Sequence, residues 1–188
     1  MKALRYLFIL LIGGVAGCVD TNKPLFGPET RVVPFRSGTQ FQVYARNHSG
    51  QPWRDQGKIK SFRADADNII RPVDEMGKTS DEEQYTLHRI GPDYFILQFE
   101  RGGAFAYGVV EYRNSEAIVT MLDCKELDHR VFISLGGRVS PDGERCSLDG
   151  VQDPIGVLKG LALLANRNQE RYVPVPGQLD APPANPPK

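Results

Sequence analysis

The sequence predicts a mainly β (α+β) fold, in which an antiparallel β-meander or a small barrel-like sheet carries one C-terminal helix packed on it. Three observations lead to this fold class. Segments that alternate apolar and polar residues recur along the chain, the connections between them are short, and one segment has apolar residues at helical spacing. Short connections join antiparallel neighbours, because a parallel crossover needs a dozen or more residues.

The first predicted strand surrounds Val43. Phe41, Val43 and Ala45 alternate with Gln and Tyr neighbours, which is typical of a half-buried strand. The segment 58–64 is expected to pair back onto it. The stretch 65–83 is rich in charge and poor in β-branched residues, so it predicts a long loop with at most one turn of helix.

The centre of the chain predicts a run of strands joined by tight turns. The turns contain Gly, Pro, Asp, Asn and Ser, the residues that turns favour. The expected strands are 84–90, 94–100, 105–113 and 116–122. A further strand is expected at 131–134, and a turn at Pro141-Asp142-Gly143 would bring Cys146 back towards Cys124.

One helix is expected near the C-terminus. Asp153 is a suitable N-cap, and Pro154 suits the first helical position, where no amide donor is needed. Apolar residues follow at helical spacing, so the helix is expected to pack across the sheet. They are Ile155, Leu158, Leu161, Ala162 and Ala165.

The N-terminus has the order of a secretory signal: a basic start, an apolar stretch and a small-residue region. Its low-polarity segment would be about 18 Å long as a helix, against a hydrocarbon core of about 30 Å, so it is too short to span. The string Val15-Ala16-Gly17-Cys18 ends this segment and resembles the lipobox of bacterial lipoproteins. The resemblance covers residues 1–18 only.

The resemblance implies a signal peptide over 1–17 and a lipid anchor on Cys18, with a diacylglyceryl group on the thiol and an acyl group on the new amine. In Gram-negative lipoproteins an aspartate directly after that cysteine favours the inner membrane. Val19 stands there instead, so the resemblance implies the outer membrane, at the periplasmic face. The alternative is a plain secreted protein in which Cys18 is incidental.

The remaining chain suits one domain. Prolines and weak apolar periodicity predict a flexible tether over 18–34, which, fully extended, reaches at most about 50 Å. A single β-rich domain follows over 35–173. The proline-rich segment 174–188 predicts a disordered tail.

The three cysteines divide into one anchor and one pair. With Cys18 assigned to lipid, Cys124 and Cys146 are expected to form a disulfide in an oxidising compartment. The bond would stabilise the fold by roughly 3 kcal/mol. The alternative is that Cys124 is a nucleophile or that both cysteines bind metal.

No catalytic motif is visible, so the chain is expected not to be an enzyme and to hold no cofactor apart from its lipid. G-x-S-x-G and H-E-x-x-H are absent from the sequence. Asp123, Cys124, Asp128 and His129 are close in sequence, but they mix soft and hard ligands, and a disulfide would remove the thiolate. No metal site is therefore expected.

Two functions from different classes remain. The first is a non-enzymatic envelope lipoprotein that binds another envelope protein as an assembly accessory, with Trp53 as a possible contact. The second is a β-barrel that binds a small apolar ligand among aromatic side chains, although plain core packing is the commoner role of such residues. The candidates are Tyr94, Phe95, Phe99, Phe105, Tyr107 and Tyr112. With 23 basic and 23 acidic side chains, the chain lacks the basic excess of a nucleic-acid binder.

Overall fold

The computed structural model describes residues 18–48, 50–164 and 167–176. The predicted signal peptide and most of the predicted tail lie outside these residues. The first strands are β1 (Val19–Thr21), β2 (Gln40–His48), β3 (Arg54–Ala64), β4 (Ile70–Val73), β5 (Tyr85–Arg89) and β6 (Tyr94–Arg101). The later strands are β7 (Ala104–Arg113), β8 (Glu116–Met121), β9 (Arg138–Val139), β10 (Cys146–Ser147) and β11 (Arg167–Pro174). The helices are α1 (His129–Ser134) and α2 (Pro154–Leu164), with 3₁₀ turns η1 (Pro28–Thr30) and η2 (Cys124–Glu126).

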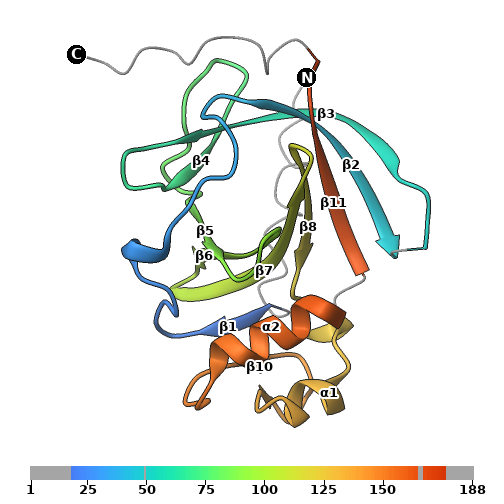
Figure 1. The fold of residues 1–188 in the computed structure, drawn as a ribbon. Helices are drawn as coiled ribbons and strands as arrows, with labels where there is room; N and C mark the ends of the chain where they lie inside the picture. The colour runs from blue at the N-terminus through green and yellow to red at the C-terminus, as the bar shows by residue number, and fades with distance from the viewer. Residues whose placement is uncertain (1–17, 49, 165–166, 177–188) are drawn as a thin grey trace, which may run out of the picture.

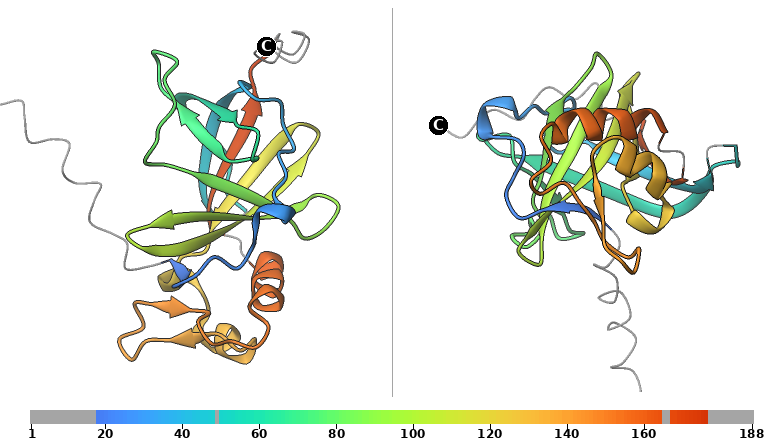
Figure 2. Two further views of the ribbon diagram at one scale, coloured as in Figure 1. Left: turned by 90° about the vertical axis from the view of Figure 1, so that its left-hand side faces the viewer. Right: turned by 90° about the horizontal axis from the view of Figure 1, so that it is seen from below.

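The main body is a closed antiparallel barrel of eight strands (Figure 1). Strands β2 to β8 follow one another around it, and β11 closes the ring between β8 and β2. The mainly β fold class is therefore confirmed. The arrangement is more than a meander, because other elements intervene in the chain between β8 and the closing strand β11. These elements form a small layer beside β7, on the outside of the barrel (Figures 1 and 2).

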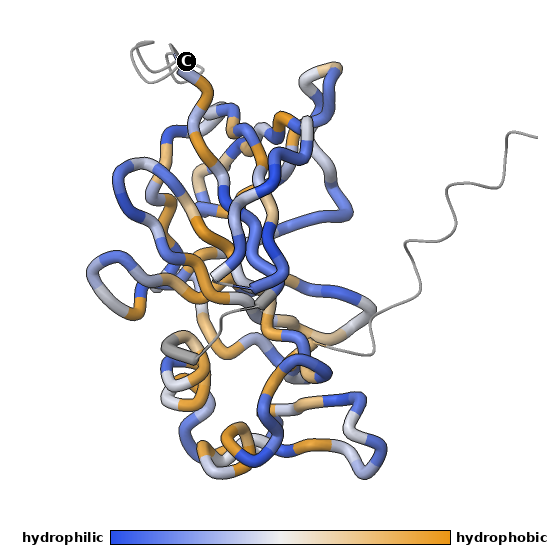
Figure 3. The backbone as a smooth tube through the Cα atoms, turned by 90° about the vertical axis from the view of Figure 1, so that its right-hand side faces the viewer, coloured by the Kyte–Doolittle hydropathy of each residue, from blue (hydrophilic) through white to orange (hydrophobic). Residues whose placement is uncertain are grey.

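The predicted central strands appear close to their expected bounds. Tight hairpins connect them because the turn residues tolerate positive φ: Gly102 and Gly103 between β6 and β7, Asn114 and Ser115 between β7 and β8. Apolar and polar residues alternate over short distances along the barrel chain (Figure 3). This alternation gives each strand an inner and an outer face.

Two local predictions are wrong. The long loop expected over 65–83 contains β4, which pairs with β3 after a turn in which Asp65 Oδ1 accepts hydrogen bonds from the amides of Asp67 and Ile69. The strand expected at 131–134 is instead α1. The carboxylate of Asp128 caps this helix by accepting from the amides of Arg130 and Val131, and this N-cap outweighs the weak β preference of the segment.

The helix predicted from Asp153 is confirmed as α2. The Asp153 carboxylate accepts a hydrogen bond from the Gly156 amide at 2.8 Å. The expectation of one helix is wrong, however, because the described residues contain two.

The segment predicted to be a flexible tether packs onto the barrel. Strand β1 lies between β7 and β10, and Val19 is fully buried. Further along, Gln98 Oε1 accepts from the amides of Leu25 and Phe26 at 3.0 and 3.2 Å, and the Phe26 ring stacks on His88. The 50 Å reach expected of residues 19–34 is therefore not available.

The elements β1, β9, β10, α1 and α2, with the turns between them, form a layer that we call the cap. Its core packs against the outer face of β6 and β7, whereas separate apolar clusters face the barrel interior. Among the described residues, none of the helices is long and apolar enough to cross a bilayer.

Candidate functional site

The barrel interior holds a cavity of about 500 Å³. Its walls come from β2 to β8, β11 and the segment before β2. The apolar part of the lining consists of Pro34, Phe35, Phe41, Ala45, Phe62, Ile70, Pro72, Leu87, Leu97, Val110, Ala117, Val119 and Met121. The volume falls within the range of pockets that enclose small organic ligands.

Aromatic rings from distant segments form one wall of the cavity. The Phe41 ring lies 5.7 Å from Phe35, 6.3 Å from Phe62 and 6.2 Å from Tyr172, measured between ring centroids. The contacts of Phe41 with Phe35 and Tyr172 are edge-to-face, a favourable geometry for aromatic pairs. The wall is thus held in place by mutual packing and leaves its inner side available to an apolar ligand.

A charged group interrupts the apolar lining where β3 and β11 face the cavity. Lys60 Nζ lies 3.5 Å from Glu170 Oε2 and donates to Tyr172 Oη at 3.3 Å. The Tyr172 hydroxyl in turn donates to the Glu170 carboxylate. The side chains of Lys60 and Glu170 are 42% and 45% exposed, so the cavity meets solvent at this pair.

A second tyrosine and carboxylate contribute to the same polar side. The Tyr85 hydroxyl donates to Glu83 Oε2 at 3.0 Å, and both residues line the cavity. Burial raises the pKa of Tyr85, and the charges of Glu83 and Glu170 raise it further. Burial and Glu170 raise the pKa of Tyr172 likewise. Both phenols therefore stay neutral and act as donors to the carboxylates.

The aromatic residues proposed from the sequence are mostly not cavity residues. Of the six, Tyr112 lines the cavity. Phe95 belongs to the buried interior cluster and Phe99 packs on the Tyr85 ring, whereas Tyr94, Phe105 and Tyr107 belong to the core beneath the cap. The aromatic rings that do line the cavity lie on six separate segments, and their shared position follows from barrel closure.

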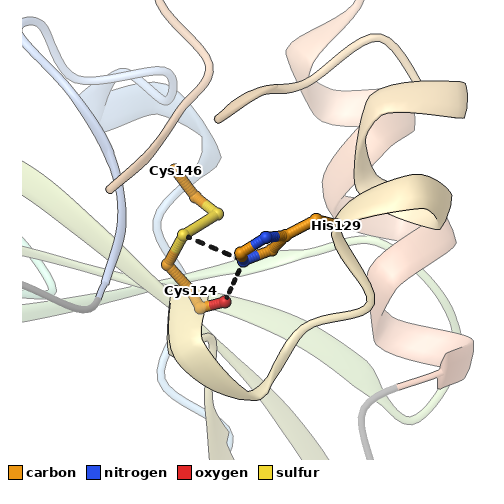
Figure 4. Close-up of side chains that lie close together, drawn as sticks. All are labelled: Cys124, His129 and Cys146. Atoms are coloured by element: carbon orange, nitrogen blue, oxygen red, sulfur yellow. Dashed lines mark hydrogen bonds between the residues drawn. A yellow bond between two sulfur atoms is a disulfide. The ribbon is translucent and has the colours of Figure 1, made fainter. Parts of the chain in front are cut away.

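The disulfide between Cys124 and Cys146 is present, with 5.3 Å between the Cα atoms (Figure 4). His129 joins them, so that three potential ligand atoms lie within 4.8 Å of one another. Its Nε2 lies 3.8 Å from Cys124 Sγ and donates to the Cys124 carbonyl oxygen at 2.9 Å. The disulfide leaves neither cysteine with a thiolate, and His129 Nε2 carries the proton that it donates to the Cys124 carbonyl oxygen. In the oxidised protein the cluster is therefore a structural one.

The two carboxylates close to Cys124 in the sequence, Asp123 and Asp128, each cap a helix. Asp123 caps η2 by accepting from the Lys125 amide at 2.9 Å, and Asp128 caps α1. The sequence spacing of these residues therefore reflects helix capping.

Trp53 and Cys18 occupy defined positions. The Trp53 ring is half-buried, and the Arg46 guanidinium of β2 lies 4.1 Å from its centroid. Cys18 is half-buried and directly precedes β1, and its backbone forms an isolated antiparallel β-bridge with Asp123. Burial raises the pKa of its thiol, and the charge of Asp123 adds to this effect.

A second depression, of about 650 Å³, lies on the cap and is wide open to solvent. It is bordered by Lys125, His129, Ile133 and the turn before β10. It encloses little, and the barrel cavity is the stronger candidate site.

No protein-family model, curated protein or solved structure matches the chain. The function of this barrel therefore has to be inferred from the geometry of its cavity.

Proposed function

We propose that this chain is a membrane-anchored envelope lipoprotein whose barrel binds a small molecule with an apolar body. The observation that carries the proposal is the cavity of about 500 Å³ inside a closed barrel, lined by aromatic and aliphatic side chains. A barrel of eight strands is wide enough either to be filled by its own side chains or to hold one small ligand. Small residues such as Ala45 and Ala117 favour the second outcome here.

The envelope location rests on the lipobox-like string that ends at Cys18 and on the disulfide, which suits an oxidising compartment. The role of assembly accessory, with Trp53 as a protein contact, stays a prediction. So does the expected lack of enzymatic activity.

Fluorescence of the uncharged probe N-phenyl-1-naphthylamine tests the cavity. We expect saturable binding of one probe per chain, with enhanced fluorescence, because the probe moves from water into an apolar site. An Ala117→Phe variant places a ring in the cavity and should abolish this binding. A folded wild-type protein that binds no probe would refute the proposal.

The matched control is Ala66→Phe, which adds the same ring at an exposed turn outside the cavity. It should bind the probe as the wild type does. Thermal unfolding of both variants shows whether loss of binding reflects a filled cavity or an unfolded barrel, and Val119→Phe provides a second filling variant on the same strand.

The anchor is tested separately by metabolic labelling with an alkyne-tagged fatty acid. We expect label on the wild-type chain and none on a Cys18→Ser variant. Equal labelling of the two chains would rule out Cys18 as the lipid attachment site.

A further inference from the structure

The polar side of the cavity is organised around a cation that the protein itself supplies. The Lys60 ammonium lies near the Glu170 carboxylate, within hydrogen-bond distance of the Tyr172 hydroxyl and 5.5 Å from the centroid of the Tyr172 ring. A carboxylate combined with an aromatic face is the usual protein environment for an organic ammonium group.

Four charged side chains line the cavity, two acidic and two basic, but they are not evenly placed. Glu83 and Glu170 bring two carboxylates, and Lys60 brings one ammonium. Arg46 also borders the cavity, but its guanidinium lies over the Trp53 ring and its Nε donates to Gln169 at 2.8 Å. The carboxylates that accept from the Tyr85 and Tyr172 hydroxyls therefore outnumber the ammonium beside them, whereas the charge of Arg46 is held next to Trp53 and Gln169.

The excess of carboxylates around Tyr85 and Tyr172 favours a cationic ligand head group over an anionic one. A ligand carboxylate would have to compete with Glu170 for Lys60 and would stand close to a second carboxylate. At half-buried positions charge–charge interactions are less screened than in water, so this repulsion would weaken the binding of an anionic ligand. Burial is the largest cause of the raised pKa values of Tyr85 and Tyr172, and the carboxylates nearby add to both shifts.

We infer that the cavity selects a ligand with an apolar body and a cationic, ammonium-type head group, which binds at the position that the Lys60 ammonium occupies in the free protein. The inference rests on the proposed function and specifies its ligand class. The half-exposed Lys60 side chain moves out into solvent, and the head group takes over its contacts with Glu170 and the Tyr172 ring. The apolar body then lies along Phe41, Phe62 and Val119.

A matched set of ligands tests the inference on the full chain in nanodiscs: octyltrimethylammonium, octanoate and octanol. Isothermal titration calorimetry, with empty nanodiscs as the blank, gives the affinity of each. We expect the cation to bind roughly tenfold more tightly than octanoate, with octanol between them. Equal affinities, or tighter binding of octanoate, would overturn the inference.

Two substitutions should shift the affinities in opposite directions. Lys60→Met removes the internal competitor and should raise the affinity for the cation about fivefold, whereas Glu170→Gln should lower it by a similar factor. The controls Lys159→Met and Glu100→Gln change the same charges at exposed positions outside the cavity and should shift it by less than about twofold. A Lys60→Met variant with weaker cation binding would contradict the inference.

Binding of the uncharged probe distinguishes failure of the inferred ligand class from failure of the proposed function. If the probe and octanol bind but charge makes no difference, the ligand class is wrong and the proposed function stands. If the probe and all three ligands fail to bind, the proposed function fails as well. Lys60→Gln repeats the test should the methionine variant not fold.

Discussion

The barrel interior and the core beneath the cap are built from the same kinds of residues, yet one is hollow and the other is filled. Beneath the cap, Val19, Ile96, Phe132 and Leu158 are completely buried and belong to one continuous cluster. Inside the barrel, many apolar side chains are only partly buried because they face the cavity. Apolar side chains therefore fill the core beneath the cap, whereas in the barrel they surround a cavity.

Matched Leu→Ala substitutions give the largest expected effect and test this contrast directly. Leu158→Ala in the cap core should lower the free energy of unfolding by about 3 kcal/mol, because it opens a new hole in a filled core. Leu97→Ala, at a position that already borders the cavity, should cost about 1 to 2 kcal/mol. Chemical denaturation measures both, and equal losses would show that the barrel interior is as tightly packed as the cap.

Removal of the disulfide tests whether the cap contributes to stability without affecting binding in the barrel. The double variant Cys124→Ala/Cys146→Ala should lose about 3 kcal/mol of unfolding free energy, since the unfolded chain regains the freedom of the loop between them. Because the bond lies in the cap, the folded variant should still bind N-phenyl-1-naphthylamine with wild-type affinity. Loss of probe binding in a folded variant would mean that the cap shapes the cavity.

Acid should weaken the contact between the barrel and the segment that follows β1. His88 is fully buried between Phe26, Thr30 and Thr86, and burial, with the nearby charge of Arg31, lowers its pKa to about 4. The unfolded chain therefore takes up a proton near pH 6.5, while the folded chain does so only near pH 4. Stability contributed by neutral His88 is present above pH 6.5 and is lost as the pH falls towards 4, by about 2 kcal/mol at pH 5.

The His88→Gln variant isolates this effect, because glutamine can bond to the same hydroxyl groups without titrating in this range. The variant should show a smaller decrease in unfolding free energy between pH 7.5 and pH 5 than the wild type. Parallel pH profiles for the two proteins would exclude His88 as the source.

The smallest expected effect concerns the strand that closes the barrel. Arg171 on β11 donates to Glu116 on β8 from Nε at 2.9 Å and from Nη2 at 2.7 Å, and both side chains are 33% exposed. A double-mutant cycle with Arg171→Met and Glu116→Gln should give a coupling energy of about 0.5 to 1 kcal/mol. A coupling near zero would show that β11 is held by its backbone pairing alone.

The sequence predicted the strands that have strong alternation or clear turns, and it missed those that do not. β5 to β8 combine Val, Ile, Phe and Tyr with tight turns, so their pattern is local. β11 has the sequence Arg-Asn-Gln-Glu-Arg-Tyr-Val-Pro, in which few residues are apolar. Its stability comes from β2 and β8 on either side, and such partners are not visible in the strand itself.

The candidate site was harder to predict for the same reason. The disulfide followed from counting cysteines, and the cap helix from Asp153 and Pro154. The cavity, in contrast, depends on which strand positions face inward after closure. Lys60, Glu170 and Tyr172 are unremarkable in sequence, and their proximity follows from the neighbouring places of β3, β2 and β11 in the ring.

The pairing of β1 with β7 and β10 would also determine how an anchored molecule stands on its membrane. Cys18 directly precedes a fully buried residue, so an acyl chain on its thiol would leave no slack between bilayer and protein. The cap would rest near the lipid head groups, and the barrel would point away at a fixed tilt and height. Such a protein would diffuse in the plane of the membrane with its barrel at a constant distance from the bilayer, and it would contact only molecules that reach that distance.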